Sequence, residues 1–230
     1  DQNKALAGNV TPGDTPGFPV TLSVPGSYKL TGNLTVPIGT TGITAAVPGI
    51  TIDLNGFNIV GANTCIRDNV TYVVNCSDVF NGSRGVATHG GSVVRNGRIS
   101  GFSIGLQYGP GDLVENMLVE QSHEGVIAQG GSQFATRAIL RNVRAQFNKS
   151  YGFSLSDTLI ESSSAGANGN SGFFARRTVI LDSVSTGNGG PGVEGSISVS
   201  IGRSVVQENK GGNIFQASSL GGNLNGNVVY

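Results

Sequence analysis

The chain has 230 residues, of which 37 are glycine, and its 14 basic residues balance its 14 acidic ones. This length is enough for one large domain with a substantial core, and the glycine share is roughly twice that of an average protein. Without a basic surplus the chain lacks the counterion-release term that dominates nucleic-acid affinity, so we expect no nucleic-acid partner. No apolar run approaches the ~18 residues that a membrane-spanning helix needs, so we expect no membrane span.

The first part of the chain, residues 1–40, shows little regular pattern. Prolines interrupt it at short intervals, which is typical of irregular and edge-like pieces of β structure. These prolines are Pro12, Pro16, Pro19, Pro25 and Pro37. We therefore predict an N-terminal capping segment over residues 1–40, followed by one β domain over residues 41–230.

Two cysteines, Cys65 and Cys76, stand eleven positions apart in the loop-like stretch CIRDNVTYVVNC. We expect the chain to leave the domain in a loop excursion over residues 62–82. No further Cys or His stands near enough to complete a zinc site, so we predict no bound metal. A local disulfide and a pair of free thiols remain as alternatives; the isolation of the pair favours the disulfide, which implies export to an oxidising compartment.

The strongest pattern is a glycine followed by an apolar residue, and it recurs along most of the chain. The intervals between successive glycines of this kind are 20, 20, 27, 20 and 20 residues. The repeat glycines are Gly85, Gly105, Gly125, Gly152, Gly172 and Gly192. The extra residues of the long interval fall around QGGSQFATR, within residues 128–137, where we expect a longer loop.

Short stretches with alternating aliphatic residues, such as LVENMLVEQSHE and ILDSVSTGNGGP, precede the glycines. A unit of ~20 residues is too short for a strand–helix–strand crossover, and the stretches lack the helical period. The remaining solution is a coil of short strands that stacks on the next coil with like residues in register. The sequence therefore predicts an all-β fold, a right-handed parallel β-helix with coils of ~20 residues.

Coils stacked ~4.8 Å apart turn each position of the repeat into a column. The residue after each glycine is apolar, and we expect these residues to form an inward column. They are Val86, Leu106, Val126, Phe153, Phe173 and Val193. Four residues before the glycine, Asn148, Asn168 and Asn188 should form a ladder of side-chain amides. We expect the glycines to adopt a positive φ, so that Gly172→Val destabilises the fold.

The stretches ITIDLNGFNIVG and PGSYKLTGNLTVP resemble an early coil and the N-terminal segment of secreted bacterial proteins of the pectin-lyase-like β-helix superfamily. The resemblance implies a secreted solenoid, extracellular or periplasmic. It does not select one activity, because that superfamily contains lyases, hydrolases, epimerases, phage tailspikes and adhesins. The Asp-Asp and Asn-Thr-Asp segments of polygalacturonases are missing, and THGG at residues 88–91 only approximates their Gly-His-Gly.

One group of residues in neighbouring columns has the chemistry of an active site. His123 and Glu124 stand just before one repeat glycine, and Lys149 and Tyr151 stand just before the next. A Glu or His base beside a Tyr or Lys acid is the minimum for proton abstraction next to a sugar carboxylate. These four residues are the candidate catalytic group; a solvated turn is the alternative explanation.

Three further residues are candidate ligand contacts. Arg84 stands two coils before the candidate group, and Arg176, with its neighbour Arg177, could bind an anionic sugar or serve only as solubilising charge. Phe174 should point outward and offer a stacking surface for a sugar or for another subunit. His89 falls on a different corner of its coil, where we expect a surface position.

Two functions remain open. The first is a non-catalytic secreted scaffold that binds a glycan or a partner subunit, including a second copy of the chain, along a face or an end of the solenoid. Missing family motifs and the absence of Trp favour it. The second is a polysaccharide lyase, hydrolase or epimerase that acts on an acidic polysaccharide. We predict no cofactor for either.

Overall fold

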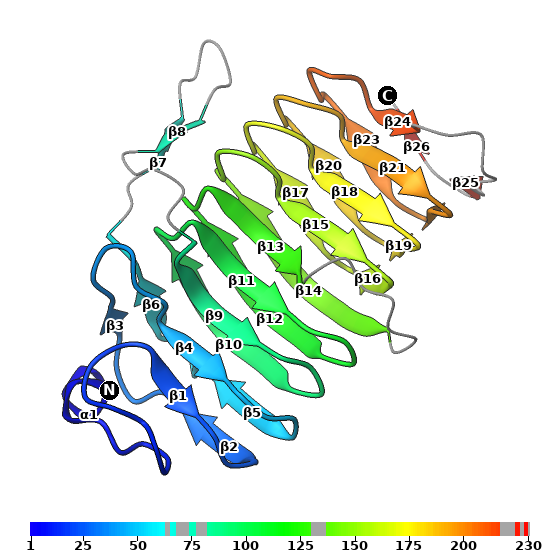
Figure 1. The fold of residues 1–230 in the computed structure, drawn as a ribbon. Helices are drawn as coiled ribbons and strands as arrows, with labels where there is room; N and C mark the ends of the chain where they lie inside the picture. Colours follow the sequence, from blue (N-terminus) through cyan, green and yellow to red (C-terminus); the bar gives the residue numbers. More distant parts are fainter. Residues whose placement is uncertain are drawn as a thin grey trace.

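The computed structural model describes residues 1–62, 65–67, 74–76, 82–129, 137–216, 224–225 and 228–229. Within them the chain forms one short helix, α1 (Gln2–Ala7), and parallel strands stacked coil upon coil into a solenoid (Figure 1). The two ends of the solenoid lie far apart, with α1 at the N-terminal end. No helix among the described residues is long and apolar enough to cross a membrane.

Two long parallel sheets form the walls of the solenoid, and each coil adds a strand to both. In spatial order, sheet A contains β1 (Val20–Leu22), β4 (Ile43–Ala45), β9 (Arg84–Thr88), β11 (Ile104–Tyr108), β13 (Glu124–Ala128), β15 (Phe153–Ser156), β18 (Phe173–Arg176), β21 (Val193–Ile197) and β24 (Ile214–Gln216).

Sheet B has two halves, which β10, β12 and β14 connect because each of them runs through both. Its first half contains β2 (Gly26–Lys29), β5 (Ile50–Asp53), β10 (Val93–Ser100), β12 (Leu113–Glu120), β14 (Ala138–Gln146), β16 (Thr158–Glu161), β19 (Val179–Leu181), β22 (Ser200–Gly202) and β25 (Leu224–Asn225). Its second half contains β3 (Leu34–Thr35), β6 (Asn58–Val60), the ends of β10, β12 and β14, then β17 (Ser164–Gly166), β20 (Val184–Thr186), β23 (Val205–Gln207) and β26 (Val228–Val229).

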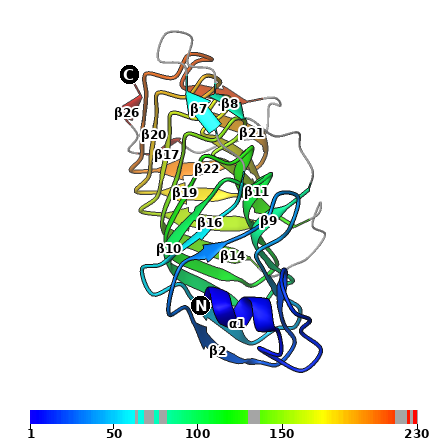
Figure 2. The same ribbon diagram turned by 90° about the vertical axis from the view of Figure 1, so that its left-hand side faces the viewer.

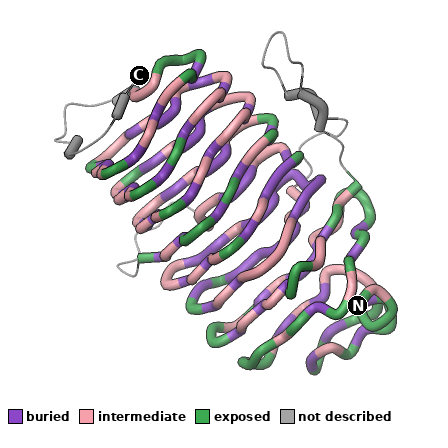
Figure 3. Tube along the Cα trace, turned by 180° about the vertical axis from the view of Figure 1, so that it is seen from behind, coloured by how far each residue is buried: buried purple, intermediate pink, exposed green. Residues whose placement is uncertain are grey.

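The core is the narrow space between the sheets, and alternation along each strand fills it. In β5, for example, Ile50 and Ile52 are buried while Thr51 and Asp53 are only partly covered. The same alternation of buried and more exposed residues is visible in many of the coloured coils of Figure 3. Since side chains of a strand point alternately to its two faces, this pattern directs one apolar set inward in every coil.

The inward column predicted after the repeat glycines is confirmed. Its residues pair in register from coil to coil, and the column runs from Val20 to Ile214. Phe153 and Phe173 stack within it, with ring centroids 4.9 Å apart and planes 13° apart. Because like residues stack on one another, the same packing arrangement is repeated from coil to coil through the core.

The asparagine ladder is also confirmed, and it is longer than predicted. Asn148 Nδ2 donates to Asn168 Oδ1 at 3.0 Å, and Asn168 Nδ2 donates to Asn188 Oδ1 at 3.0 Å. Asn209 extends the ladder by one coil, because Asn188 Nδ2 donates to its Oδ1 at 2.8 Å. Asn148, Asn168 and Asn188 are at most 1% exposed. Buried amides of this kind are tolerated because each one bonds its neighbours.

The expectation that the repeat glycines have a positive φ is wrong. None of the six has one, and the left-handed conformation falls on turn residues such as Phe147, Ala167 and Gly187. The repeat glycines are required by space instead. A Cβ on Gly172 would lie 2.7 Å from both Asn188 Nδ2 and Gly192 O, and would also collide with Ser185. The glycine lets one coil approach the ladder and backbone of the next.

Within residues 1–40, for which we predicted a capping role, β1, β2 and β3 already pair in parallel with β4, β5 and β6 of the next coil. The helix α1 lies across the end of this first coil (Figure 2). Most of the loop excursion predicted over residues 62–82, and of the loop within 128–137, falls outside the described residues.

The excursion contains a hairpin of β7 (Cys65–Arg67) and β8 (Val74–Cys76), which pair antiparallel. The register places Cys65 directly opposite Cys76. Direct partners of an antiparallel pair have Cα atoms ~4.5–5.5 Å apart, within the ~4.4–6.8 Å that a disulfide spans. The backbone is therefore compatible with the disulfide, which stays a prediction.

We expect Gly172→Ala to lower the free energy of unfolding by about 1–3 kcal/mol, because the added methyl group overpacks the contact between two coils. Gly166→Ala is the matched control, since the nearest atom to a Cβ there, Thr186 O, is 3.8 Å away. Denaturant unfolding of both variants measures the difference. Equal stability of Gly172→Ala and the wild type would contradict the steric explanation.

We expect the protein unfolded without reductant to show no thiol that reacts with a maleimide, because the predicted disulfide joins Cys65 and Cys76. Reduction should expose two reactive thiols, and Cys65→Ser should leave one reactive thiol without any reductant. Mass spectrometry counts the labels. Two labels on the unreduced wild type would show that the cysteines are free.

Candidate functional site

The candidate catalytic residues lie along one edge of sheet A, where the chain passes through the repeat glycines into β13 and β15. We call this the glycine edge. Gly125 N donates to Tyr151 O at 3.0 Å, so Glu124 and Tyr151 lie in adjacent coils at the same edge. Lys149 N donates to Ser122 O at 2.9 Å, which places Lys149 beside His123. The structure therefore brings together the four residues that the sequence grouped.

Glu124 is half-buried at this edge, and its environment favours the protonated carboxyl. Burial raises the pKa of the Glu124 carboxyl above its ordinary value of 4.5. Among the described residues no cation pairs with it, because the ion pairs found there involve other carboxylates. A half-buried carboxyl with a raised pKa is a typical proton carrier in active sites, since burial makes its carboxylate a stronger base than an exposed one.

The pKa of His123 is shifted downward, in the direction opposite to that of Glu124. Burial lowers the pKa of its imidazole below 6.5, and the nearby Lys149 ammonium lowers it further. Both effects disfavour a positive charge on the ring. The imidazole is therefore mostly neutral at neutral pH, when it can accept a proton.

Tyr151 lies in the next coil and joins the group to Phe174. Its ring centroid is 5.3 Å from that of Phe174, with planes tilted by 38°. Burial raises the pKa of the Tyr151 hydroxyl, and the carboxylates of Glu194 and Glu124 raise it further. The hydroxyl therefore keeps its proton at neutral pH and can donate it. The aromatic pair therefore lies beside the candidate catalytic group, whereas the sequence suggested only a separate stacking residue.

Two more residues of this cluster were missed by the sequence reasoning. Ser171 Oγ donates to Glu194 Oε2 at 2.6 Å. The negative charge of Glu194 raises the pKa of the Tyr151 hydroxyl. Glu194 lies in register with Phe174 in the adjacent strand. Ser171 occupies the position before a repeat glycine, as Glu124 and Tyr151 do. Following these two columns one or two coils further would have identified both residues.

Arg84 does not join the cluster. Ile104 lies in register with both Arg84 and Glu124, so the two are separated by two coils, ~10 Å along the solenoid. Arg84 Nη1 donates to Gly82 O at 3.1 Å. This bond ties its guanidinium to the base of the loop excursion, away from Glu124.

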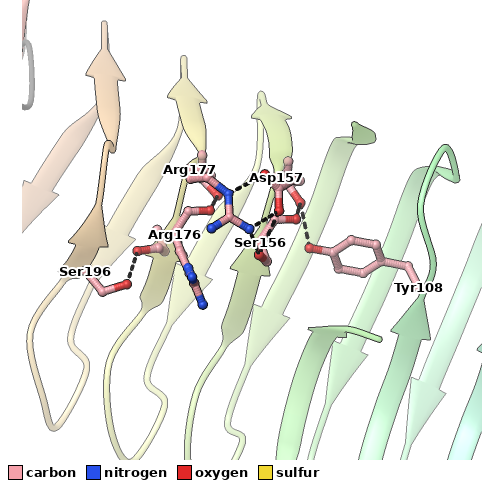
Figure 4. A network of polar contacts seen from close by, with 9 residues as sticks. Tyr108, Ser156, Asp157, Arg176, Arg177 and Ser196 are labelled. Atoms are coloured by element: carbon pink, nitrogen blue, oxygen red, sulfur yellow. Dashed lines mark hydrogen bonds and ion pairs between the residues drawn. The ribbon is translucent and has the colours of Figure 1, made fainter. Parts of the chain in front are cut away.

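Arg176 and Arg177, adjacent in sequence, have different surroundings at the far edge of sheet A (Figure 4). Arg177 makes a bidentate ion pair with Asp157, with Nε and Nη2 each 2.6 Å from a carboxylate oxygen. That ion pair links the turn after β15 to the turn after β18 in the next coil. Arg176 is exposed, on the same outward side of β18 as Phe174 and two residues further along. Arg176 therefore stays a candidate ligand contact on sheet A, whereas Arg177 links two coils through Asp157.

A second carboxyl with a raised pKa, that of Asp112, is a structural group. Burial raises its pKa, and it accepts hydrogen bonds from Thr88 Oγ1, Gly109 N and Ser92 N. It thereby ties two coils together below the surface. His89 Nδ1 lies 2.9 Å from Ala45 O, and its side chain is at the surface as expected. Among the described residues, no three His, Cys, Asp or Glu side chains gather as metal ligands would.

We expect Glu124→Gln to stabilise the protein at neutral pH and to leave its stability unchanged in acid. The folded state binds the Glu124 proton more tightly than the unfolded chain does, so its ionisation makes stability fall as pH rises above 4.5 through the raised pKa. Glutamine removes that cost. Thermal melting from pH 4 to pH 8 measures the difference, and parallel curves for the two proteins would contradict it.

No protein-family model and no curated protein sequence matches the chain. Solved structures do match. The periplasmic alginate epimerase AlgG is 16% identical, with a TM-score of 0.56 over 82% of this chain and 51% of that one. Pectate lyase Pel9A is 17% identical, with a TM-score of 0.52 over 84% of this chain and 57% of that one. The present chain thus spans little more than half of either protein.

The A-module of mannuronan C-5 epimerase AlgE4 from Azotobacter vinelandii is 12% identical, with a TM-score of 0.55 over 89% of this chain and 79% of that module. At such identities the likeness shows the shared fold and nothing about the reaction. It agrees with the stacked parallel coils seen here. The chain is a right-handed parallel β-helix with the pectin-lyase-like fold.

Proposed function

We propose that the protein acts on an acidic polysaccharide that lies across sheet A, and that Glu124 and Tyr151 carry the chemistry. The observation that supports this most is the half-buried Glu124 carboxyl, whose pKa burial raises and which lies one coil from a protonated tyrosine. The solved structures of the same fold include a pectate lyase and alginate epimerases, which are named for acidic polysaccharides. The reaction class is accordingly that of a lyase, hydrolase or epimerase.

In the lyase form of the reaction, the Glu124 carboxylate takes the proton from the sugar carbon next to the substrate carboxylate. The electron pair of that C–H bond forms a carbon–carbon double bond as the glycosidic C–O bond breaks. Tyr151 gives its proton to the departing oxygen, so atoms and charges balance. Proton transfer by a positioned group contributes ~10²–10⁴-fold to the rate, and in this proposal His123, neutral at neutral pH, assists as a further proton acceptor.

Substrate binding would draw on the rest of the outward surface. The Phe174 and Tyr151 rings provide an apolar platform for a sugar face, while Lys149 and Arg176 are exposed cations for carboxylates. Lys149 lies at the glycine edge and Arg176 at the far edge, so a chain of sugars crossing sheet A would meet both. Export to the periplasm or the extracellular space, where such substrates occur, completes the proposal.

A non-catalytic scaffold is the second candidate, and a feature of sheet B favours it. An outward column of partly exposed aliphatic residues continues through five coils in register. Its members are Val93, Leu113, Ile139, Leu159 and Val179. A stripe of this kind suits association with a second copy of the chain. Sedimentation of the wild type decides whether it self-associates.

We expect the wild type to release unsaturated sugar products from a uronate-containing polysaccharide, and Glu124→Gln and Tyr151→Phe to slow this by about a hundredfold or more. Ultraviolet absorbance follows a lyase, and reducing ends or proton exchange into the polymer follow the other reactions. Glu115→Gln, on sheet B, is the control and should keep full activity. The acidic limb of kcat/KM should lie above pH 4.5, because the base must be ionised and its pKa is raised.

If wild type and Glu124→Gln bind polysaccharides with the same affinity and neither converts them to products, the catalytic proposal is rejected and the scaffold is supported. Loss of binding in Phe174→Ala, with Glu124→Gln still binding, would place the glycan on sheet A in either case.

A further inference from the structure

The N-terminal end of the solenoid presents three strand edges, and the chain covers two of them with side chains. At the edge of β1, Thr21 N donates to Asp14 Oδ1 at 2.7 Å and Thr11 Oγ1 donates to Thr21 O at 2.7 Å. At the edge of β3, Thr35 N donates to Gln2 Oε1 at 2.8 Å and Gln2 Nε2 donates to Thr35 O at 3.0 Å. The Gln2 amide thus takes the place of a neighbouring strand.

The third edge, that of β2, is open. Gly26 N donates to Gly49 O and Leu30 N donates to Asp53 O, so these groups face β5. Since backbone groups of successive residues point to opposite sides of a strand, the N–H and C=O groups of Ser27 and Lys29 face away from β5. Ser27 and Lys29 are exposed, and within the described residues β2 pairs on its β5 side alone. Figure 2 shows α1 in front of the coil and β2 beside it, uncovered by the helix.

An apolar cavity of about 270 Å³ adjoins this edge. Ser27, Tyr28 and Lys29 form one side of it, Asp1, Lys4 and Ala5 at α1 form another, and core residues of the first two coils form its floor. The floor residues include Val20, Leu22, Leu34, Ile43 and Ile52. An edge strand beside an apolar cavity has the two parts that strand-addition sites use: the main chain supplies hydrogen bonds, and the cavity takes a side chain.

A column of charges that ends at this edge indicates what would bind there. From β2 to β16, the outward residues in register are Lys29, Asp53, Arg95, Glu115, Arg141 and Glu161, and their signs alternate. Asp53 lies 3.2 Å from Arg95, and Glu161 lies 2.5 Å from Arg141. In the part of the chain that the structure describes, Lys29 is the last member of this column and has a neighbour in it on one side only. The next position of the series calls for an acidic residue.

We propose that the β2 edge binds an extended peptide segment of another protein, as a parallel strand with an acidic residue beside Lys29 and apolar residues over the cavity. This site is separate from the one on sheet A, and the proposal does not depend on the proposed reaction. The register gives the order of residues, because β5 meets β2 in the same way, with Ile52 opposite Tyr28 and Asp53 opposite Lys29. The expected pattern is apolar, any residue, apolar, acidic.

A fluorescent peptide with the sequence of residues 48–54, PGITIDL, is the probe, because it carries this pattern. We expect it to bind the full chain with a change in anisotropy, and to protect the Ser27 and Lys29 amides from hydrogen exchange. Ser27→Pro removes one edge N–H without touching the β5 side, and should weaken binding about tenfold. Thermal melting of that variant verifies its fold.

Charge reversal tests the register without disturbing the backbone. Lys29→Glu should weaken binding of PGITIDL, and a peptide with lysine in place of its aspartate should recover the affinity on Lys29→Glu alone. The proposal is wrong if the peptide binds Ser27→Pro and the wild type equally, if the charge exchange restores nothing, or if no binding occurs. It is also wrong if the wild type self-associates and Ser27→Pro does not, because a second copy then occupies the edge.

Discussion

Parallel pairing between successive coils is the constraint on which the rest of this structure depends. Each coil must present its backbone groups to the next at one strand spacing, ~4.8 Å, so a residue meets its own counterpart rather than a complementary one. Only residues that tolerate a copy of themselves suit such a column. Phe153 and Phe173 stack ring upon ring, and Asn168 gives one amide hydrogen to the next coil while its oxygen accepts from the previous one. Gly172 leaves the space that the Asn188 amide and the Gly192 carbonyl of the next coil occupy.

The same constraint explains how the surface acquires its chemistry. Positions at the edge of a sheet need not repeat as the core column does, and the glycine edge passes from the buried Ile104 through the half-buried Glu124 and Tyr151 to the buried Ser171 within four coils. Among the described residues Glu124 has no ion-pair partner, whereas sheet B pairs its charges in alternation. The candidate site is thus a short stretch of one column in which the residues differ from coil to coil, while the residues of the adjacent columns repeat.

Ends are the weak point of a solenoid, because the pairing that stabilises every inner coil stops there. At the N-terminal end of this solenoid, side chains make the hydrogen bonds that a further strand would make. A glutamine amide bonds the edge of β3, and a threonine and an aspartate bond the edge of β1. The contrast with β2 is chemical as well as geometric. The alternating charge column reaches the end at Lys29 and is left without its next member.

The spacing of glycines determined the coil length, the parallel register, the inward column and most of the asparagine ladder, because repetition along the chain becomes stacking in space. It also placed His123, Glu124, Lys149 and Tyr151 in adjacent coils. Three matters needed the tertiary structure. The role of the glycines depends on atoms of the next coil, and a φ expectation from local preference was wrong. The contact of Phe174 with Tyr151 depends on rotamers. The separation of Arg176 from Arg177 depends on a turn that gives Asp157 to only one of them, because neighbours in sequence need not share surroundings once the chain bends.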